Sequence, residues 1–174
     1  MMMQMLAAGG MPILTDGVRA PDEDNPRGYL EFEPVKNTKA DPSWVPTAVG
    51  KAVKMVTVLL RDLPAGFDYR VILMRRDPDE VLQSQKAMLV RLGRSGAQAG
   101  DEHLKELFSR DLSRTIGWLE AQPMVRYVAL DYATCIRDPR HAAAVVSELL
   151  DRKVNAEAMV QAVDAALYRK KSFS

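Results

Sequence analysis

Three apolar runs along the chain have the length and composition of buried strands. They are residues 53–60 (VKMVTVLL), 69–74 (YRVILM) and 125–130 (VRYVAL). Gly50 and Pro64 bound the first run, as turn residues commonly bound a strand. The second run is the strongest, because Val-Ile-Leu-Met without alternation is typical of a strand covered on both faces. We therefore predict three strands, preceded by a short extended piece at residues 11–14.

Helices are predicted between and after these strands, where apolar residues recur at helical spacing. The opening stretch MMMQMLAA is rich in helix formers and ends at Gly9-Gly10. Strands separated by helices imply an α/β fold, with a parallel sheet flanked by helices on both faces. The remaining predicted helices are Pro78 to about Leu92, about Asp101 to Ala121, Pro139–Leu150 and Ala156–Tyr168.

The polar segment 15–44 is predicted to be a long loop. It carries four prolines together with many Asp, Glu and Asn residues. Long loops inside compact domains are usually functional. Its aromatic residues Tyr29 and Trp44 either line an acceptor pocket or anchor the loop to the core. A second break, 93–100 (GRSGAQAG), is glycine-rich.

Composition and charge narrow the classes of function. The chain has 174 residues, which favours a single domain over 1–174, and its net charge of +1 points to neither nucleic acid nor an anionic membrane. No apolar run approaches the roughly 20 residues of a membrane span. The single cysteine, Cys135, excludes an internal disulfide, so we expect a cytoplasmic protein with a buried, inert thiol. Neither His103 nor His141 has a partner at metal-ligand spacing, and no metal site is predicted.

The junction after residues 69–74 has the features of an anion site. Arg75 and Arg76 stand where the strand gives way to a helix. Asp77 can cap that helix, Pro78 suits its first position, and Glu80 completes a capping-box spacing. Ligands bind at such strand ends, where free N–H groups face the ligand, and a guanidinium suits a phosphate dianion. The alternative is that the arginines pair with nearby carboxylates at the surface.

The stretch RRDPDEVLQS resembles the 3′-phosphate-binding motif of sulfotransferases. In that motif Arg-Asn/Asp-Pro opens a helix, and a serine follows eight residues after the arginine; Arg76 and Ser84 have this spacing. The family transfers a sulfuryl group from PAPS (3′-phosphoadenosine 5′-phosphosulfate) to a hydroxyl or amine. The resemblance implies that Arg76 and Ser84 bind the nucleotide, with PAPS as co-substrate and no metal.

Further resemblance extends over essentially the whole chain. The Met-rich opening helix resembles the helix that follows the family's 5′-phosphosulfate loop. DNPRGYLEFE resembles the acidic, aromatic segment of bacterial sulfotransferase-like proteins, and YVALDYATCIRDPRHAAAVVSELL resembles their late strand and helix. The resemblance implies the sulfotransferase variant of the P-loop NTP hydrolase fold.

The phosphate loop of that fold has no counterpart in the sequence. A P-loop needs a strand, a glycine-rich turn and a basic residue before its helix. The sequence begins at the helix, and residues 93–100 follow a helix rather than a strand. We therefore expect a chain truncated at its amino terminus relative to the family, without the first strand. Sheet edges exposed in this way would favour association with a second copy.

The resemblance also suggests catalytic residues. Lys54, in Lys-Met-Val, matches the lysine of a Lys-Thr-His pattern that contacts the transferring group, while Val56 holds the histidine position. Glu31 is then the candidate general base, with Glu33 second. Alternatively, Glu31 is a solvated carboxylate in a loop. The alternative for Lys54 is a lysine at a strand end that pairs with an acidic side chain.

Two functions remain open at this point. One is a sulfotransferase whose partners are a nucleotide and an unidentified acceptor. The other is a catalytically inactive nucleotide-binding or interaction module that retains only the 3′-phosphate pocket. A kinase-like relative is disfavoured, because the sequence has no Walker-type Lys-Ser/Thr.

Overall fold

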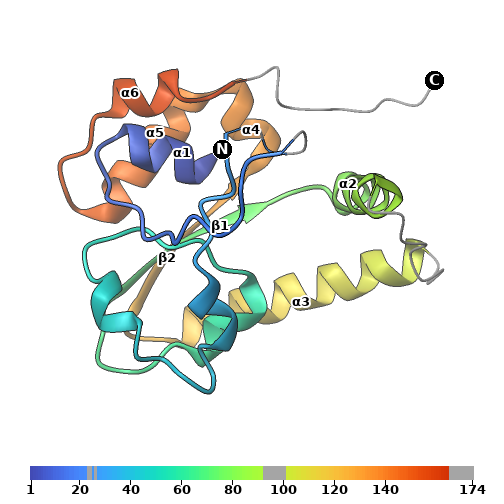
Figure 1. The fold of residues 1–174 in the computed structure, drawn as a ribbon, viewed down its shortest axis with the longest axis horizontal. Coiled ribbons are helices and arrows are strands. Elements are labelled where there is room, and N and C mark those ends of the chain that lie inside the picture. The colour runs from blue at the N-terminus through green and yellow to red at the C-terminus, as the bar shows by residue number, and fades with distance from the viewer. Residues whose placement is uncertain (23–24, 26, 92–100, 165–174) are drawn as a thin grey trace.

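A computed structural model describes residues 1–22, 25, 27–91 and 101–164 of the chain (Figure 1). It has a mixed α/β fold built around two parallel strands, β1 (Tyr69–Arg75) and β2 (Val125–Asp131). The strands pair in register from Tyr69 opposite Val125 to Arg75 opposite Asp131. The predictions for these two strands, and for their parallel pairing, are therefore confirmed.

Helices surround this sheet. Within the described residues, no helix is long and apolar enough to span a membrane. The α-helices are α1 (Met2–Ala8), α2 (Pro78–Arg91), α3 (Asp101–Ala121), α4 (Tyr132–Arg137), α5 (Pro139–Leu150) and α6 (Ala156–Gln161). Three short 3₁₀ helices are η1 (Glu33–Asn37), η2 (Val45–Ala48) and η3 (Thr57–Asp62).

Both faces of the sheet are covered, as predicted from its unbroken apolar strands. Leu73 of β1 is 3% exposed and belongs to a core cluster with Leu60 of η3 and Leu119 of α3. Successive strand residues point to opposite faces, and Leu130 of β2 belongs to a second cluster with α1, α5 and α6. In Figure 1 α1, α5 and α6 lie above the strands and α3 lies below them.

The centre of the second cluster is a contact between α1 and α6. Met5 of α1 and Met159 of α6 have no exposed surface, nor has Val146 of the neighbouring helix α5. Gly9 ends α1 against α6, and a Cβ on it would lie 2.7 Å from Met159 Cγ. Unbranched methionines fill such irregular gaps well, which explains the methionine-rich opening of the chain.

The prediction of a strand at residues 53–60 is wrong. In the described part of the chain the one isolated bridge lies just before this run, between Ile13 and Ala52, and residues 57–62 form η3. Val56 and Val58 are 61% and 57% exposed, whereas Leu60 is buried against β1 and α3. A short apolar run does not by itself distinguish a strand from a turn of helix that buries one side chain in three.

The prediction for the last helix extends too far. Helix α6 stops at Gln161, and just beyond it Arg27 Nη1 donates to the carbonyl of Ala162 at 2.8 Å and its Nη2 pairs with Asp164 at 2.8 Å. Residues 165–168 lie outside the described residues, as do 93–100. Helix α4 was not predicted, although the Asp131 cap at its start is a local signal.

One edge of β1 carries no backbone hydrogen bonds to the rest of the described chain. The N–H of Tyr69 donates to the carbonyl of Met124 at 2.8 Å, so every second residue from Tyr69 faces β2. The alternate residues face away from β2: Arg70, Ile72 and Met74.

Hydrogen exchange should therefore alternate along β1. The amides of Ile72 and Met74 should exchange at least roughly tenfold faster than those of Val71 and Leu73. Amide exchange followed by NMR measures this directly. Equal protection of both sets would mean that the outer edge is paired in solution.

Gly9→Ala should destabilise the fold by about 1–3 kcal/mol, because the new methyl group collides with Met159. Gly117→Ala is the matched control. Gly117 lies exposed in α3 with nothing within 4 Å of an added Cβ, so alanine there should stabilise by about 0.5–1 kcal/mol. Urea unfolding of both variants measures the two changes; a neutral Gly9→Ala would contradict the tight α1–α6 contact.

Candidate functional site

Asp77 caps the junction between β1 and α2, as predicted. Asp77 Oδ1 accepts a hydrogen bond from the N–H of Asp79 at 2.8 Å, and the carbonyl of Asp77 accepts from Val81 at 3.1 Å. Pro78 is the first helical residue. The amino terminus of α2 therefore follows directly on the carboxyl end of β1, the arrangement that favours anion binding.

Arg76 is held at this edge by contacts from two elements. Its Nε donates to Glu80 Oε2 at 3.1 Å, and its guanidinium carbon lies 5.2 Å from the ring centroid of Tyr132, the first residue of α4. The Arg76 side chain is 31% exposed. Burial raises the pKa of the Tyr132 hydroxyl. The positive charge of Arg76 opposes this rise, and the negative charge of Glu80 adds to it. The pairing with Glu80 is the surface alternative expected from the sequence, and it leaves the guanidinium partly open to solvent.

Ser84 stands on the same side of α2 as Glu80. It lies one turn further along the helix and is exposed. Residues four apart on a helix are neighbours on one face, and Glu80 contacts Arg76. Ser84 therefore shares a helix face with Glu80, the residue that contacts Arg76.

Carboxylates balance part of the positive charge at this edge. Asp131, which ends β2, accepts from the N–H and the hydroxyl of Thr134 at 2.8 and 3.0 Å. The backbone hydrogen bond from Thr134 lowers the pKa of Asp131; burial opposes this, and the charges of Arg75 and Arg137 add to it. Asp131 therefore offsets part of the positive charge of Arg75 and Arg137 at this edge.

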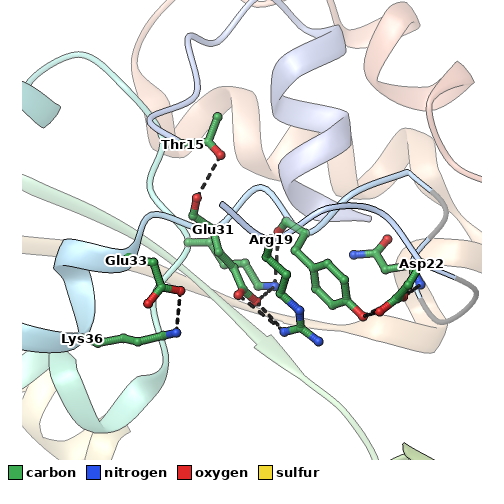
Figure 2. Close-up of polar contacts among 9 residues, drawn as sticks. Thr15, Arg19, Asp22, Glu31, Glu33 and Lys36 are labelled. Atoms are coloured by element: carbon green, nitrogen blue, oxygen red, sulfur yellow. Dashed lines mark hydrogen bonds and ion pairs between the residues drawn. The ribbon is translucent and has the colours of Figure 1, made fainter. Parts of the chain in front are cut away.

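The predicted catalytic pair Glu31 and Lys54 meets in the structure. Lys54 Nζ donates to Glu31 Oε1 at 2.9 Å and to the carbonyl of Tyr29 at 3.3 Å. Arg19 Nη1 lies 3.5 Å from each carboxylate oxygen of Glu31, and its guanidinium carbon lies 3.3 Å from the ring centroid of Tyr29 (Figure 2). Sequence reasoning missed Arg19, because no local pattern links it to Glu31.

Backbone contacts within the long loop position Glu31. Its carbonyl accepts from the Thr15 hydroxyl at 2.8 Å and from the Asp16 N–H at 3.3 Å. Asp16 Oδ2 in turn accepts from the N–H of Glu33 at 2.6 Å. The carboxylate of Glu33 points instead to Lys36, as Figure 2 shows. Of the two predicted carboxylates, the one that contacts Lys54 is Glu31.

The charge state of Glu31 follows from these contacts. Burial raises the pKa of Glu31, but the hydrogen bond and charge of Lys54, together with those of Arg19, lower it below its ordinary value overall. A carboxylate of lowered pKa is a weak general base. Glu31 would abstract a proton only after Lys54 had turned toward another anion.

Other candidates from the sequence have structural roles. Trp44 is 8% exposed, donates from Nε1 to the Thr38 hydroxyl at 3.2 Å and packs edge-on against Phe32, so it anchors the loop. Cys135 is buried, and burial raises the pKa of its thiol. His103 and His141 are exposed. Among the described side chains, no group of His, Cys, Asp or Glu could hold a metal ion.

The comparisons with known proteins give no relative. No protein-family model matches the chain, and no curated protein or solved structure is significantly similar to it. The residues and their geometry therefore carry the functional argument.

Lys54→Met should raise the pKa of Glu31, because it removes the main group that lowers it. A lowered folded-state pKa gives stability that is present above the unfolded pKa and lost as pH falls through the folded pKa. The difference in unfolding free energy between wild type and Lys54→Met should accordingly shrink as the solution is acidified. Carboxyl NMR titration and urea unfolding at several pH values measure both effects.

Lys36→Met is the matched control for this experiment. It removes a cation that pairs with Glu33 rather than with Glu31. The Glu31 titration should not change in that variant. A Glu31 pKa at or above its ordinary value in the wild type would contradict the observed contacts.

Proposed function

We propose that the chain is a sulfotransferase-like protein. Arg76 and Ser84 bind the 3′-phosphate of PAPS, and the sulfuryl group passes to a hydroxyl or amine acceptor beside Lys54 and Glu31. The P-loop-type sulfotransferase fold implied by the sequence resemblance is part of this proposal.

The observation that carries the proposal is the position of Arg76. It lies at the carboxyl end of a parallel strand, beside a capped helix amino terminus. Ligands of open α/β sheets bind at that edge. The Nε of Arg76 donates to Glu80. Its Nη1 and Nη2 make no hydrogen bond to the described part of the chain. These groups can donate to two phosphate oxygens, a geometry that guanidinium favours.

Lys54 and Glu31 would each have one role in the proposed transfer. Transfer breaks the bond between sulfur and the oxygen of the 5′-phosphate and forms a bond from sulfur to the acceptor atom, which loses its proton. Lys54 neutralises charge on the transferring group, and Glu31 takes the acceptor proton. The ion pair between them must open first. Its side chains are 41% and 23% exposed, and ion pairs at the surface contribute only about 0–1 kcal/mol.

A second candidate is a nucleotide-binding module without catalysis. Two observations favour it: Lys54 and Glu31 neutralise each other, and Val56, at the histidine position of the family pattern, is 61% exposed. Such a module would bind the nucleotide at Arg76 but would not transfer sulfate. Titration with nucleotide and a turnover assay with PAPS separate the two candidates.

Arg76→Ala should weaken binding of 3′,5′-adenosine bisphosphate, the product of PAPS, by about ten- to a hundredfold. The reason is the loss of a charge-assisted phosphate contact of about 1.5–3 kcal/mol. Glu80→Gln should preserve or strengthen binding, because it removes the carboxylate that competes for Arg76. Isothermal titration calorimetry of the folded variants measures these affinities.

Arg126→Ala is the matched control. Arg126 is an exposed arginine near the amino end of β2, paired loosely with Asp151 at 3.7 Å. Its loss should leave the affinity unchanged. An equal affinity in wild type and Arg76→Ala, or absence of binding to the folded wild type, would refute the proposed site.

A further inference from the structure

Exposed apolar side chains gather where η3 meets α3. Val56, Val58 and Leu107 are 61%, 57% and 41% exposed. The other large apolar side chains exposed to this degree in the described residues, Val18 and Val49, lie in loops. Exposed apolar groups that share one surface commonly mark a binding site.

Two of these side chains, Val58 and Leu107, line a shallow surface groove. Its cavity volume is about 350 Å³ and its lining residues are Val58, Leu107, Phe108, Arg110, Asp111 and Arg114. Small-molecule sites occupy roughly 300–1,000 Å³, so the groove is of a size for a small ligand.

The groove is held in shape by contacts beneath it. Thr57 Oγ1 donates to Asp111 Oδ2 at 3.2 Å and ties η3 to α3. Leu60 of η3 belongs to the same buried cluster as Leu119 of α3. These contacts join η3 to α3, the two elements that form the walls of the groove.

The charged side chains that line the groove differ in whether they have a partner. Arg110 Nη2 pairs with Glu106 Oε1 at 2.8 Å, and Asp111 accepts from Thr57. Arg114 is exposed and makes no hydrogen bond or ion pair with the described residues. It is therefore the cation in the groove that is available to a ligand.

The spacing along α3 sets the length of the ligand. Leu107 and Arg114 are seven residues apart, about 10 Å along a helix. A ligand that covers Val58 and Leu107 with an apolar group can therefore place an anionic group against Arg114, one heptad further along the helix. Asp111 lies between them and disfavours a second negative charge.

We propose that this groove binds small amphiphilic monocarboxylates, with an aryl or medium-chain alkyl group over Val58 and Leu107 and the carboxylate on Arg114. A planar carboxylate matches the guanidinium fork. The site is independent of Arg76 and of the proposed sulfotransferase activity.

The test is a titration of the full chain with phenylbutyrate, followed by amide NMR and calorimetry, beside the neutral analogue phenylbutanol. Phenylbutyrate should shift the amides of Val58, Leu107 and Phe108 and bind more tightly than the alcohol. Arg114→Gln should weaken phenylbutyrate about tenfold or more and leave phenylbutanol unchanged. Leu107→Ser, at an exposed position, should weaken both.

Arg126→Gln is the matched control and should bind both probes like the wild type. The proposal is overturned if neither probe shifts the groove amides. It is equally overturned if the two probes bind equally well, or if Arg114→Gln and Arg126→Gln behave alike. Circular dichroism of each variant confirms that it is folded.

Discussion

The parallel pairing of β1 with β2 is the constraint on which the rest of the structure depends. Because the strands end together, at Arg75 opposite Asp131, the helices that follow them begin at one edge. Arg76, at the start of one connection, therefore meets the ring of Tyr132, at the start of the other. The pairing persists because both sheet faces are buried, one under α1, α5 and α6 and the other under η3 and α3.

The two candidate cations, Arg76 and Lys54, are both paired with carboxylates. Arg76 is paired with Glu80, and Lys54 with Glu31, so each candidate cation already has a carboxylate partner. Pairs of this partial exposure are weak and exchange readily. Under the proposed function, a phosphate dianion at Arg76 would offer a stronger charge-assisted contact than the carboxylate does.

Loop 15–44 is ordered by its own contacts in the part that carries Glu31. Thr15 and Asp16 hold the backbone around Glu31, while Trp44 is anchored in a small separate cluster with Val35 and Val45. The candidate carboxylate is thus supported by the scaffold at both ends of the loop. This explains how a residue in a polar segment comes to a defined position beside Lys54.

What the sequence determined by itself is local in origin. Strands β1 and β2, helices α2 and α3, and the capped junction at Asp77 and Pro78 were predicted because apolar periodicity and capping depend on neighbouring residues. The resemblance that singled out Glu31 and Lys54 named the two residues without indicating that they contact each other.

The tertiary structure decided the features that depend on distant partners. Residues 53–60 have no neighbouring strand in the described part of the chain, and Leu60 enters the core through η3. Just beyond the end of α6, Arg27, more than a hundred residues away in the sequence, binds Ala162 and Asp164. Folding also brings Arg19 to Glu31. It likewise places Val58 and Leu107, from separate segments, in one groove. Contacts between segments far apart in the chain leave no periodic or capping signal in either segment, so only the folded structure reveals them.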